Sequence, residues 1–442
     1  MAKVQLETRQ IGGIIIILFG VGMLLSALFT NPWVGRLTRG AAVVDYADVL
    51  RGYFLWALFL GAATFALGRK VYRGKSWADG FSVFFLLCAL FVLGDRWLLT
   101  KLGLTIWEYD PELHYVHRPG AVRTLTSAGR PEDLIRINEH GFHDDEFPRQ
   151  KPSGELRGLM LGDSVTMGYG VTYAETFSKK LEDLLAERDG LHGRHQIINA
   201  GVHGYSTFQE RVTLERSLDL APDFVTVGFC MNDVTEPFVV NTEYGGTGLD
   251  YHGVTQTPNP ISGLLANETG FGRLLQKIAQ AGKSLDAAKR LEIFNTHKMA
   301  LESRTNPEFQ EGWTIVLAEM GKLYEVAKAN ELPIALLIFP YTYQLGDPAT
   351  RIPQQILTEH AAEHGVDVID FTPIFAEAVY QEADVVALLE QQGKDPEQIA
   401  KFFAWRMDEY FFDEDHFREP GHALVAARLL EWLEAKGLAG AG

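Results

Sequence analysis

From residue 156 onward, short apolar runs alternate with amphipathic stretches that have the period of a helix. This alternation predicts β-α-β units and therefore an α/β fold with a parallel sheet. Ligands of such sheets bind at the carboxyl ends of the strands, so the residues that follow each strand are the first candidates for function. The predicted strands are 156–162, 196–199, 224–229, 334–339 and 366–369, and the predicted helices are 174–187, 208–218 and 421–436.

The first hundred residues are much more apolar than the rest of the chain. Runs at 11–29, 53–68 and 81–99 predict three transmembrane helices, and the second could extend backwards over 43–50. A cleaved signal peptide is the alternative for the first run, since Lys3 and Arg9 precede it and Ala27 lies near its end. We favour a retained helix because two more apolar runs follow.

The loop between the second and third runs is basic, with Arg69, Lys70, Arg73 and Lys75. The positive-inside rule places this loop, and with it the N-terminus, in the cytoplasm, although three arginines in the first loop weaken the contrast. Three crossings of an inner membrane then leave everything after about residue 100 in the periplasm or outside the cell. Near the end of the third run, Asp95 and Arg96 are expected to form an interfacial salt bridge.

The chain divides into a membrane domain at 1–100, a connecting region at 101–155 that packs on the core, and the α/β domain at 156–442. Within the connecting region, residues 137–142 resemble a short strand and turn. A long insertion at about 236–310 interrupts the α/β pattern. Excursions of this length are usually functional or mobile, so a lid or a substrate wall is expected here, with a plain surface elaboration as the alternative.

Four polar motifs follow predicted strands or precede the last helix. Ser164 ends the first strand within Gly-Asp-Ser, Gly201 ends the second within Asn-Ala-Gly, and Asn232 follows the third within Met-Asn-Asp. Asp413 and His416 lie three residues apart before the last helix, close enough for a turn to bring the carboxylate onto the imidazole. Each of the first three motifs alone could be an ordinary turn. Together they supply the nucleophile, oxyanion donors, acid and base that acyl transfer requires.

Two neighbouring residues are alternatives with weaker support. Asp415 could replace Asp413 as the acid, but adjacent side chains tend to diverge. His422 follows at the start of the last helix and is expected to be structural.

These motifs resemble the SGNH/GDSL hydrolase superfamily, named for Ser, Gly, Asn and His in four blocks, over residues 156–436. The resemblance implies Ser164 as nucleophile, His416 as base and Asp413 as its orienting acid. It also implies an oxyanion hole made by the backbone N–H groups of Ser164 and Gly201 and by the side chain of Asn232. The implied fold is a flavodoxin-like three-layer α/β/α sandwich with a five-stranded parallel sheet. The chain departs from the pattern in two places, with valine after Gly-Asp-Ser and Cys230 where the third block usually has glycine.

Composition excludes some partners and cofactors. A net charge of −17 argues against nucleic acid, because phosphate binding needs a basic face. A disulfide between Cys88 and Cys230 is not expected, since they fall in an apolar run and a soluble strand. The mechanism implied needs no metal or organic cofactor. Four scattered histidines lack the spacing of a zinc site and are interpreted as surface or packing residues: His114, His117, His140 and His143.

The sequence therefore predicts a membrane-anchored serine esterase that acts on an ester of a cell-envelope glycan or lipid. An O-acyltransferase that uses the same serine on envelope polysaccharide is the alternative, and it would need an external acyl donor or a partner. A non-catalytic subunit of a membrane complex, with a membrane protein partner, is the alternative outside catalysis. The full set of Ser164, Asn232, Asp413 and His416 argues against that last hypothesis.

Overall fold

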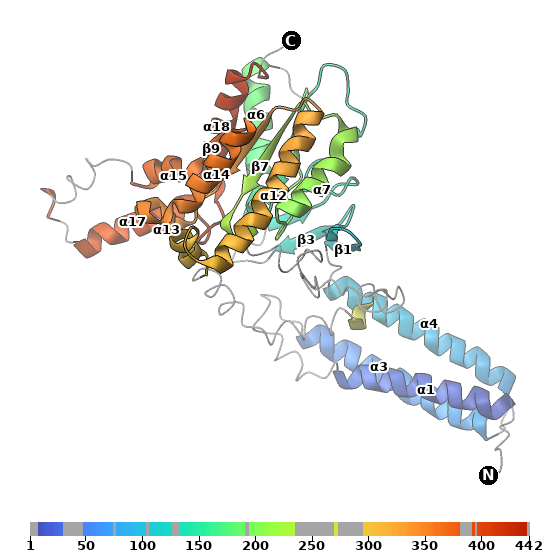
Figure 1. The fold of residues 1–442 in the computed structure, drawn as a ribbon. Helices are drawn as coiled ribbons and strands as arrows, with labels where there is room; N and C mark the ends of the chain where they lie inside the picture. The colour runs from blue at the N-terminus through green and yellow to red at the C-terminus, as the bar shows by residue number, and fades with distance from the viewer. Residues whose placement is uncertain are drawn as a thin grey trace. The chain divides into compact units, whose positions relative to one another are not determined.

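The computed structural model describes residues 8–29, 47–73, 77–102, 106–125, 133–190, 194–234, 269–272, 295–380, 391–393 and 396–439. The chain forms two compact units (Figure 1). One unit comprises Met1–Thr105 with Leu249–Asp286, and the other comprises Ile106–Gly248 with Ala287–Gly442. Most of the predicted insertion at 236–310, up to residue 294, lies outside the described residues apart from 269–272, so its role as a lid stays a prediction.

The second unit is built on a five-stranded parallel sheet with the order β6-β5-β7-β8-β9. The residues of β5 and β7 are almost all buried, because helices cover both faces of the sheet. The predicted parallel sheet is therefore confirmed. The strands are β5 (Leu156–Gly162), β6 (His195–Asn199), β7 (Phe224–Phe229), β8 (Ile334–Ile338) and β9 (Asp367–Asp370).

Helices flank this sheet in two layers (Figure 1). The chain crosses from β5 outward to β6 and then reverses towards β7, β8 and β9. Because parallel crossovers are right-handed, this reversal puts the first helix on one face and the later crossover helices on the other. The α6 helix (Phe177–Asp189) accordingly packs with α18 (Glu419–Ala435), and α7 (Thr207–Ser217) packs with α12 (Pro307–Ala329). The last crossover helix is α14 (Ile352–His364).

Among the predicted boundaries that differ from the structure, two differ for clear local reasons. The helix predicted from residue 174 starts as a 3-10 turn, Tyr173–Glu175, and α6 itself begins after Thr176, whose hydroxyl caps it. A short strand and turn were predicted at 137–142, but the strand lies earlier, as β4 (Asp133–Arg136). Residues 137–142 form only the turn, because the side-chain oxygen of Asn138 accepts the N–H groups of His140 and Phe142.

The connecting region forms two small hairpins, which pack on the α/β core within the second unit. The first pairs β1 (Trp107–Asp110) with β2 (His114–His117), and the second pairs β3 (Val122–Leu125) with β4. Tyr115 of the first hairpin is completely buried.

The first unit contains three helices at the positions of the apolar runs: α1 (Thr8–Phe29), α3 (Ala47–Tyr72) and α4 (Trp77–Leu102). The α1 and α3 helices approach closely at glycines, as a Cβ atom on Gly20 would lie 2.6 Å from Phe65 N. Small residues allow this kind of backbone approach between membrane helices. By length and composition, one described segment, Phe54–Tyr72, could cross a membrane, while the apolar segment Gln10–Leu25 is shorter.

Asp95 does not form the salt bridge with Arg96 that the sequence predicted. Its two carboxylate oxygens accept the backbone N–H groups of Gly270 and Phe271, each at 2.9 Å. A carboxylate is a favourable partner for the unpaired N–H groups at the start of a helical turn, whereas side chains of adjacent helical residues point apart.

Candidate functional site

Ser164 lies at the carboxyl end of β5, where the chain enters the short helix α5 (Ser164–Met167). Asp163 caps this helix, since its Oδ1 accepts the N–H of Val165 at 2.9 Å. Burial raises the pKa of Asp163, and the Val165 N–H and the nearby His416 oppose this shift. Ser164 itself is 3% exposed, so its hydroxyl is held in a buried, structurally fixed position.

His416 reaches Ser164 from the other end of the chain. It lies between α17 (Pro396–Tyr410) and α18, in a loop closed by pairing of Phe411 with Phe417. Its Nε2 is 2.8 Å from Ser164 Oγ, and its Nδ1 is 2.9 and 3.1 Å from the two carboxylate oxygens of Asp413. The structure thus brings together the predicted nucleophile, base and acid at hydrogen-bonding distances.

Asp413 and Asp415 both lie near Nδ1 of His416. The nearest Asp415 oxygen is 3.3 Å away, farther than either oxygen of Asp413. Asp413 Oδ1 also accepts the backbone N–H groups of Asp415 and His416, at 3.2 and 3.0 Å, which fixes its carboxylate. The geometry therefore favours Asp413 as the orienting acid and places Asp415 as a second acidic neighbour.

Asn232 follows β7 in the 3-10 turn Met231–Val234, as the sequence predicted. Its Nδ2 donates to Asp163 Oδ2 at 3.2 Å. This bond fixes the orientation of the Asn232 amide group. The carboxylate of Asp163, which caps α5, thus also fixes the position of Asn232.

The N–H of Gly201, which was predicted to donate to the oxyanion, has another acceptor in the structure. Its N–H donates to Asn199 Oδ1 at 3.1 Å, which closes a tight turn after β6. A Cβ atom at this position would lie 2.3 Å from Met167 N, so only glycine lets the loop pack against α5. The sequence pattern found a required glycine here, and the geometry accounts for it by packing.

Gly204, three residues later, was not predicted to be an oxyanion donor. Its φ is +75°, a left-handed value that favours glycine. Among the residues that the structure describes, its N–H donates to no acceptor. In the sequence, the only signal for Gly204 was a second glycine shortly after the Asn-Ala-Gly motif. Which of the two glycines has an N–H without an acceptor among the described residues is shown by their hydrogen bonds and by the φ of Gly204.

Aromatic rings lie around the imidazole of His416. The Tyr169 ring lies 4.7 Å from that of His416 and stacks on His203 at 5.4 Å. His203 is in turn 6.5 Å from His416, and Phe412 meets Tyr169 edge-on. The loop that carries His203 and Gly204 therefore borders the Ser164–His416 pair.

The remaining titratable candidates have packing roles. Burial raises the pKa of the Cys230 thiol well above its usual value, which keeps it protonated. Burial lowers the pKa of His422 to about 3, and the neutral ring accepts the N–H of Phe177 at the start of α6. His140 and His143 bond backbone oxygens, those of Phe147 and Met167, at 2.8 Å. His114 and His117 are also buried.

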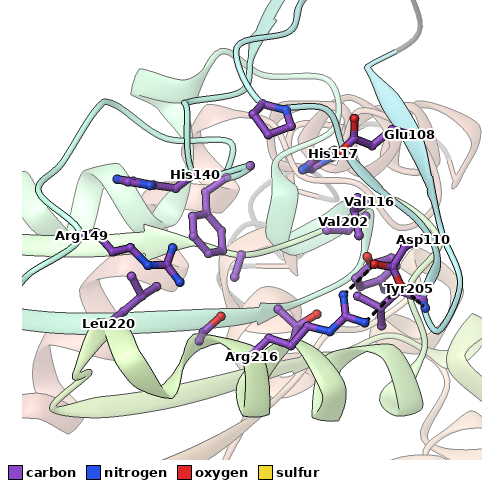
Figure 2. A pocket seen from close by; sticks show the side chains of 17 residues that line it. Glu108, Asp110, Val116, His117, His140, Arg149, Val202, Tyr205, Arg216 and Leu220 are labelled. Atoms are coloured by element: carbon purple, nitrogen blue, oxygen red, sulfur yellow. Dashed lines mark hydrogen bonds and ion pairs between the residues drawn. The ribbon is translucent and has the colours of Figure 1, made fainter.

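A separate cavity of about 250 Å³ lies between the first hairpin and α7 (Figure 2). An ion pair between Asp110 and Arg216 and the side chain of Tyr205 line it, and Ser164, Asp413 and His416 do not. The neighbours of Gly201, Ala200 and Val202, also line it, whereas Gly201 faces α5. The cavity and α5 therefore lie on opposite sides of this loop.

Comparison with known proteins identifies the family of the domain. The family described as GDSL-like Lipase/Acylhydrolase matches residues 160–388, more than half of the chain. No curated protein matches. Because the match includes Ser164, Gly201 and Asn232, the resemblance inferred from the sequence motifs is confirmed.

The solved structures that match this chain are distant in sequence. A two-domain esterase active on acetylated mannans, crystallised with mannopentaose, is 16% identical with a TM-score of 0.35, and the match covers 64% of this chain and 50% of that one. A catalytic mutant of Axe2, an acetylxylan esterase from Geobacillus stearothermophilus, is 13% identical with a TM-score of 0.35. This match covers 64% of the present chain and 95% of the Axe2 chain. TesA is 11% identical with a TM-score of 0.34, covering 63% and 98%. On the family match, this chain belongs to the GDSL-like lipase/acylhydrolase family and is a serine ester hydrolase.

Proposed function

We propose that the protein is a membrane-anchored esterase that removes an acyl group from a glycan or lipid of the cell envelope, with Ser164, His416 and Asp413 as its catalytic triad. One observation carries the catalytic part of this proposal. His416 Nε2 lies 2.8 Å from Ser164 Oγ while its Nδ1 is held by Asp413, which is the arrangement that activates a serine hydroxyl.

The reaction follows from these contacts. His416 Nε2 accepts the proton of Ser164 as Oγ attacks the ester carbonyl, and Asp413 stabilises the imidazolium that forms. The imidazolium then protonates the leaving alcohol, which leaves an acyl-serine. The same imidazole takes a proton from a water molecule as its oxygen attacks the acyl-serine. The imidazolium then returns this proton to Ser164 Oγ as the bond to the acyl group breaks, which releases the carboxylic acid and restores the serine.

The oxyanion that forms in each step needs hydrogen-bond donors. We assign these to Ser164 N–H, Gly204 N–H and Asn232 Nδ2. Gly204 replaces Gly201 in this assignment, because Gly201 N–H already bonds Asn199 whereas Gly204 N–H has no acceptor among the described residues. Asn232 is included because it follows β7 and its bond to Asp163 ties its amide group to the residue next to Ser164.

The membrane location rests on the surface of the first unit. Soluble proteins rarely expose large contiguous apolar patches, and exposed apolar side chains on all three helices are what lipid contact requires. The substrate class follows from this location and from the esterase family. The exposed apolar side chains are Ile11, Ile15, Leu18, Phe19, Val21, Leu25, Leu55, Leu58, Phe59, Val83, Phe85, Leu86, Val92, Leu93 and Trp97.

Turnover of p-nitrophenyl acetate by the full chain in detergent tests the catalytic part. We expect Ser164→Ala to lose activity by at least about a thousand-fold, as is usual when the nucleophile of a triad is removed. Ser178→Ala is the matched control, since it removes another buried serine hydroxyl, one that bonds Thr176 instead of the triad. Equal rates for the wild type and Ser164→Ala would contradict the proposal.

A further inference from the structure

The hydroxyl of Tyr115 holds the loop that we assign to the oxyanion site. Tyr115 lies in β2 of the connecting region, is completely buried, and packs between the rings of Trp107 and Tyr205. Its hydroxyl donates to the carbonyl oxygen of Gly204 at 2.8 Å and lies 3.1 Å from that of His203. One side chain from the connecting region therefore contacts the carbonyl groups on both sides of Gly204.

The contact with His203 bears on the direction of the Gly204 N–H. The carbonyl of His203 and the N–H of Gly204 belong to one planar peptide group, and in a trans peptide they point in opposite directions. A hydroxyl that binds the carbonyl oxygen from one side directs the N–H to the other side. The ring of His203, which stacks on Tyr169 beside His416, shows that this loop borders the catalytic residues.

The loop needs such a constraint because of its glycine. Gly204 has a φ of +75° and no side chain, so rotation of its peptide groups meets little steric resistance. A rotated peptide would turn the N–H away from the position of the oxyanion. It would also remove the acceptor from a buried hydroxyl, which is costly in an apolar surrounding.

We propose that Tyr115 is a positioning residue for catalysis: its hydroxyl fixes the orientation of the Gly204 peptide so that the N–H of Gly204 points to the developing oxyanion. This inference rests on the proposed function. It assigns part of the catalytic arrangement to residues 106–125, which lie before the α/β core in the sequence.

The test compares two buried tyrosines of the same cluster in the full chain. Tyr115→Phe removes the hydroxyl that binds the two carbonyls. Tyr205→Phe removes a hydroxyl that donates to the Tyr115 carbonyl oxygen at 2.8 Å and touches neither peptide of Gly204. Both changes delete one buried hydroxyl and keep the ring, so a purely structural role predicts similar effects on activity.

We expect Tyr115→Phe to lower kcat for p-nitrophenyl acetate about ten-fold with KM within two-fold, and Tyr205→Phe to leave both near wild-type values. Loss of a whole oxyanion donor costs about a hundred- to a thousand-fold, and misorientation of one donor should cost less. Inactivation by diethyl p-nitrophenyl phosphate, which phosphorylates the nucleophilic serine, provides a second readout and should slow by a similar factor in Tyr115→Phe alone. Assays are run well below the lower of the two melting temperatures.

Three outcomes have distinct meanings. Wild-type kcat in Tyr115→Phe would overturn the inference and leave the proposed function intact, provided that Ser164→Ala is inactive. Equal losses in both tyrosine variants would also overturn it, because packing alone would then explain the effect. Wild-type activity in Ser164→Ala would instead overturn the proposed function itself, and the inference with it.

Discussion

At the scale of single residues, Asp144 is a buried carboxyl group beside the site. It is 2% exposed, its Oδ2 accepts the backbone N–H of Asn199 at 3.0 Å, and its Oδ1 accepts the hydroxyl of Tyr173. Asn199 in turn bonds Gly201 N–H and the carbonyl oxygen of Met167. Burial raises the pKa of Asp144 to about 7, and the charge of Glu182 adds to this effect, against the hydrogen bonds that it accepts.

This pKa predicts a stability that depends on pH. In the unfolded chain Asp144 loses its proton near its ordinary pKa of about 4, whereas the folded protein keeps it until about 7. The contribution of Asp144 to the free energy of unfolding is therefore fully present below about pH 4 and is lost as the pH rises to about 7. Asp144→Asn cannot titrate, so the difference in unfolding free energy between wild type and variant should change by a few kcal/mol across this window. Chemical denaturation at pH 4, 5.5, 7 and 8 measures it, and a constant difference would show that Asp144 is ionised in the folded protein throughout.

The sequence was sufficient for some site residues and insufficient for others. Ser164 and Asn232 could be predicted because each follows a buried strand, and parallel strands bring their carboxyl ends to one edge. The contact between Asp413 and His416 could be predicted because the two residues are three positions apart and a local turn is enough to bring them together. The choice between Gly201 and Gly204 depends on which N–H already has an acceptor, and no spacing encodes that. Tyr115 could not be found because its partners lie 88 and 89 residues away, across a contact between hairpin and loop.

At the scale of elements, the strands in the middle of the sheet were predicted best. The bounds of β5 and β7 agree with the prediction at both ends, because burial along almost the whole strand makes each a mostly apolar run, with Arg157 and Thr226 as the exceptions. The edge strand β9 is only partly buried, carries aspartate at both ends, and is displaced by one residue from the predicted range. Helix starts depend on single capping residues such as Thr176, which apolar periodicity does not reveal.

The packing of α1 against α3 gives a prediction for two glycines of the same helix. A Cβ atom on Gly20 would lie 2.6 Å from Phe65 N, whereas a Cβ atom on Gly22 would meet nothing within 4 Å. We expect Gly20→Ala to lower the thermal unfolding midpoint of the full chain in detergent, because the two backbones must separate. Gly22→Ala should leave the midpoint unchanged or raise it, since alanine favours a helix over glycine by about 1 kcal/mol. Equal shifts in both variants would show that α1 and α3 do not pack as described.

At the scale of the whole molecule, the sequence predicted separate membrane and α/β regions, but not that part of the insertion belongs to the unit of the apolar helices. Residues 269–272 belong to the unit of the apolar helices, and two of their N–H groups bond Asp95 near the end of α4. A charged residue at the end of an apolar run was interpreted as half of an ion pair with its neighbour. Its real partners lie about 175 residues later in a segment without strong periodicity, so no local pattern could identify them.

The proposed topology gives the last prediction. Basic residues at 69–75 place that loop in the cytoplasm, and three crossings place the α/β domain on the outer side. Arg73→Cys and Glu311→Cys each introduce an exposed thiol, one beside the basic loop and one on α12. A membrane-impermeant maleimide applied to intact spheroplasts should label the thiol at 311 and not the thiol at 73, and both should react once the membrane is permeabilised. The unmodified chain is the blank, because Cys230 is buried and Cys88 lies within α4. Labelling at 73 without labelling at 311 would reverse the orientation, and labelling at both before permeabilisation would exclude a crossing between them.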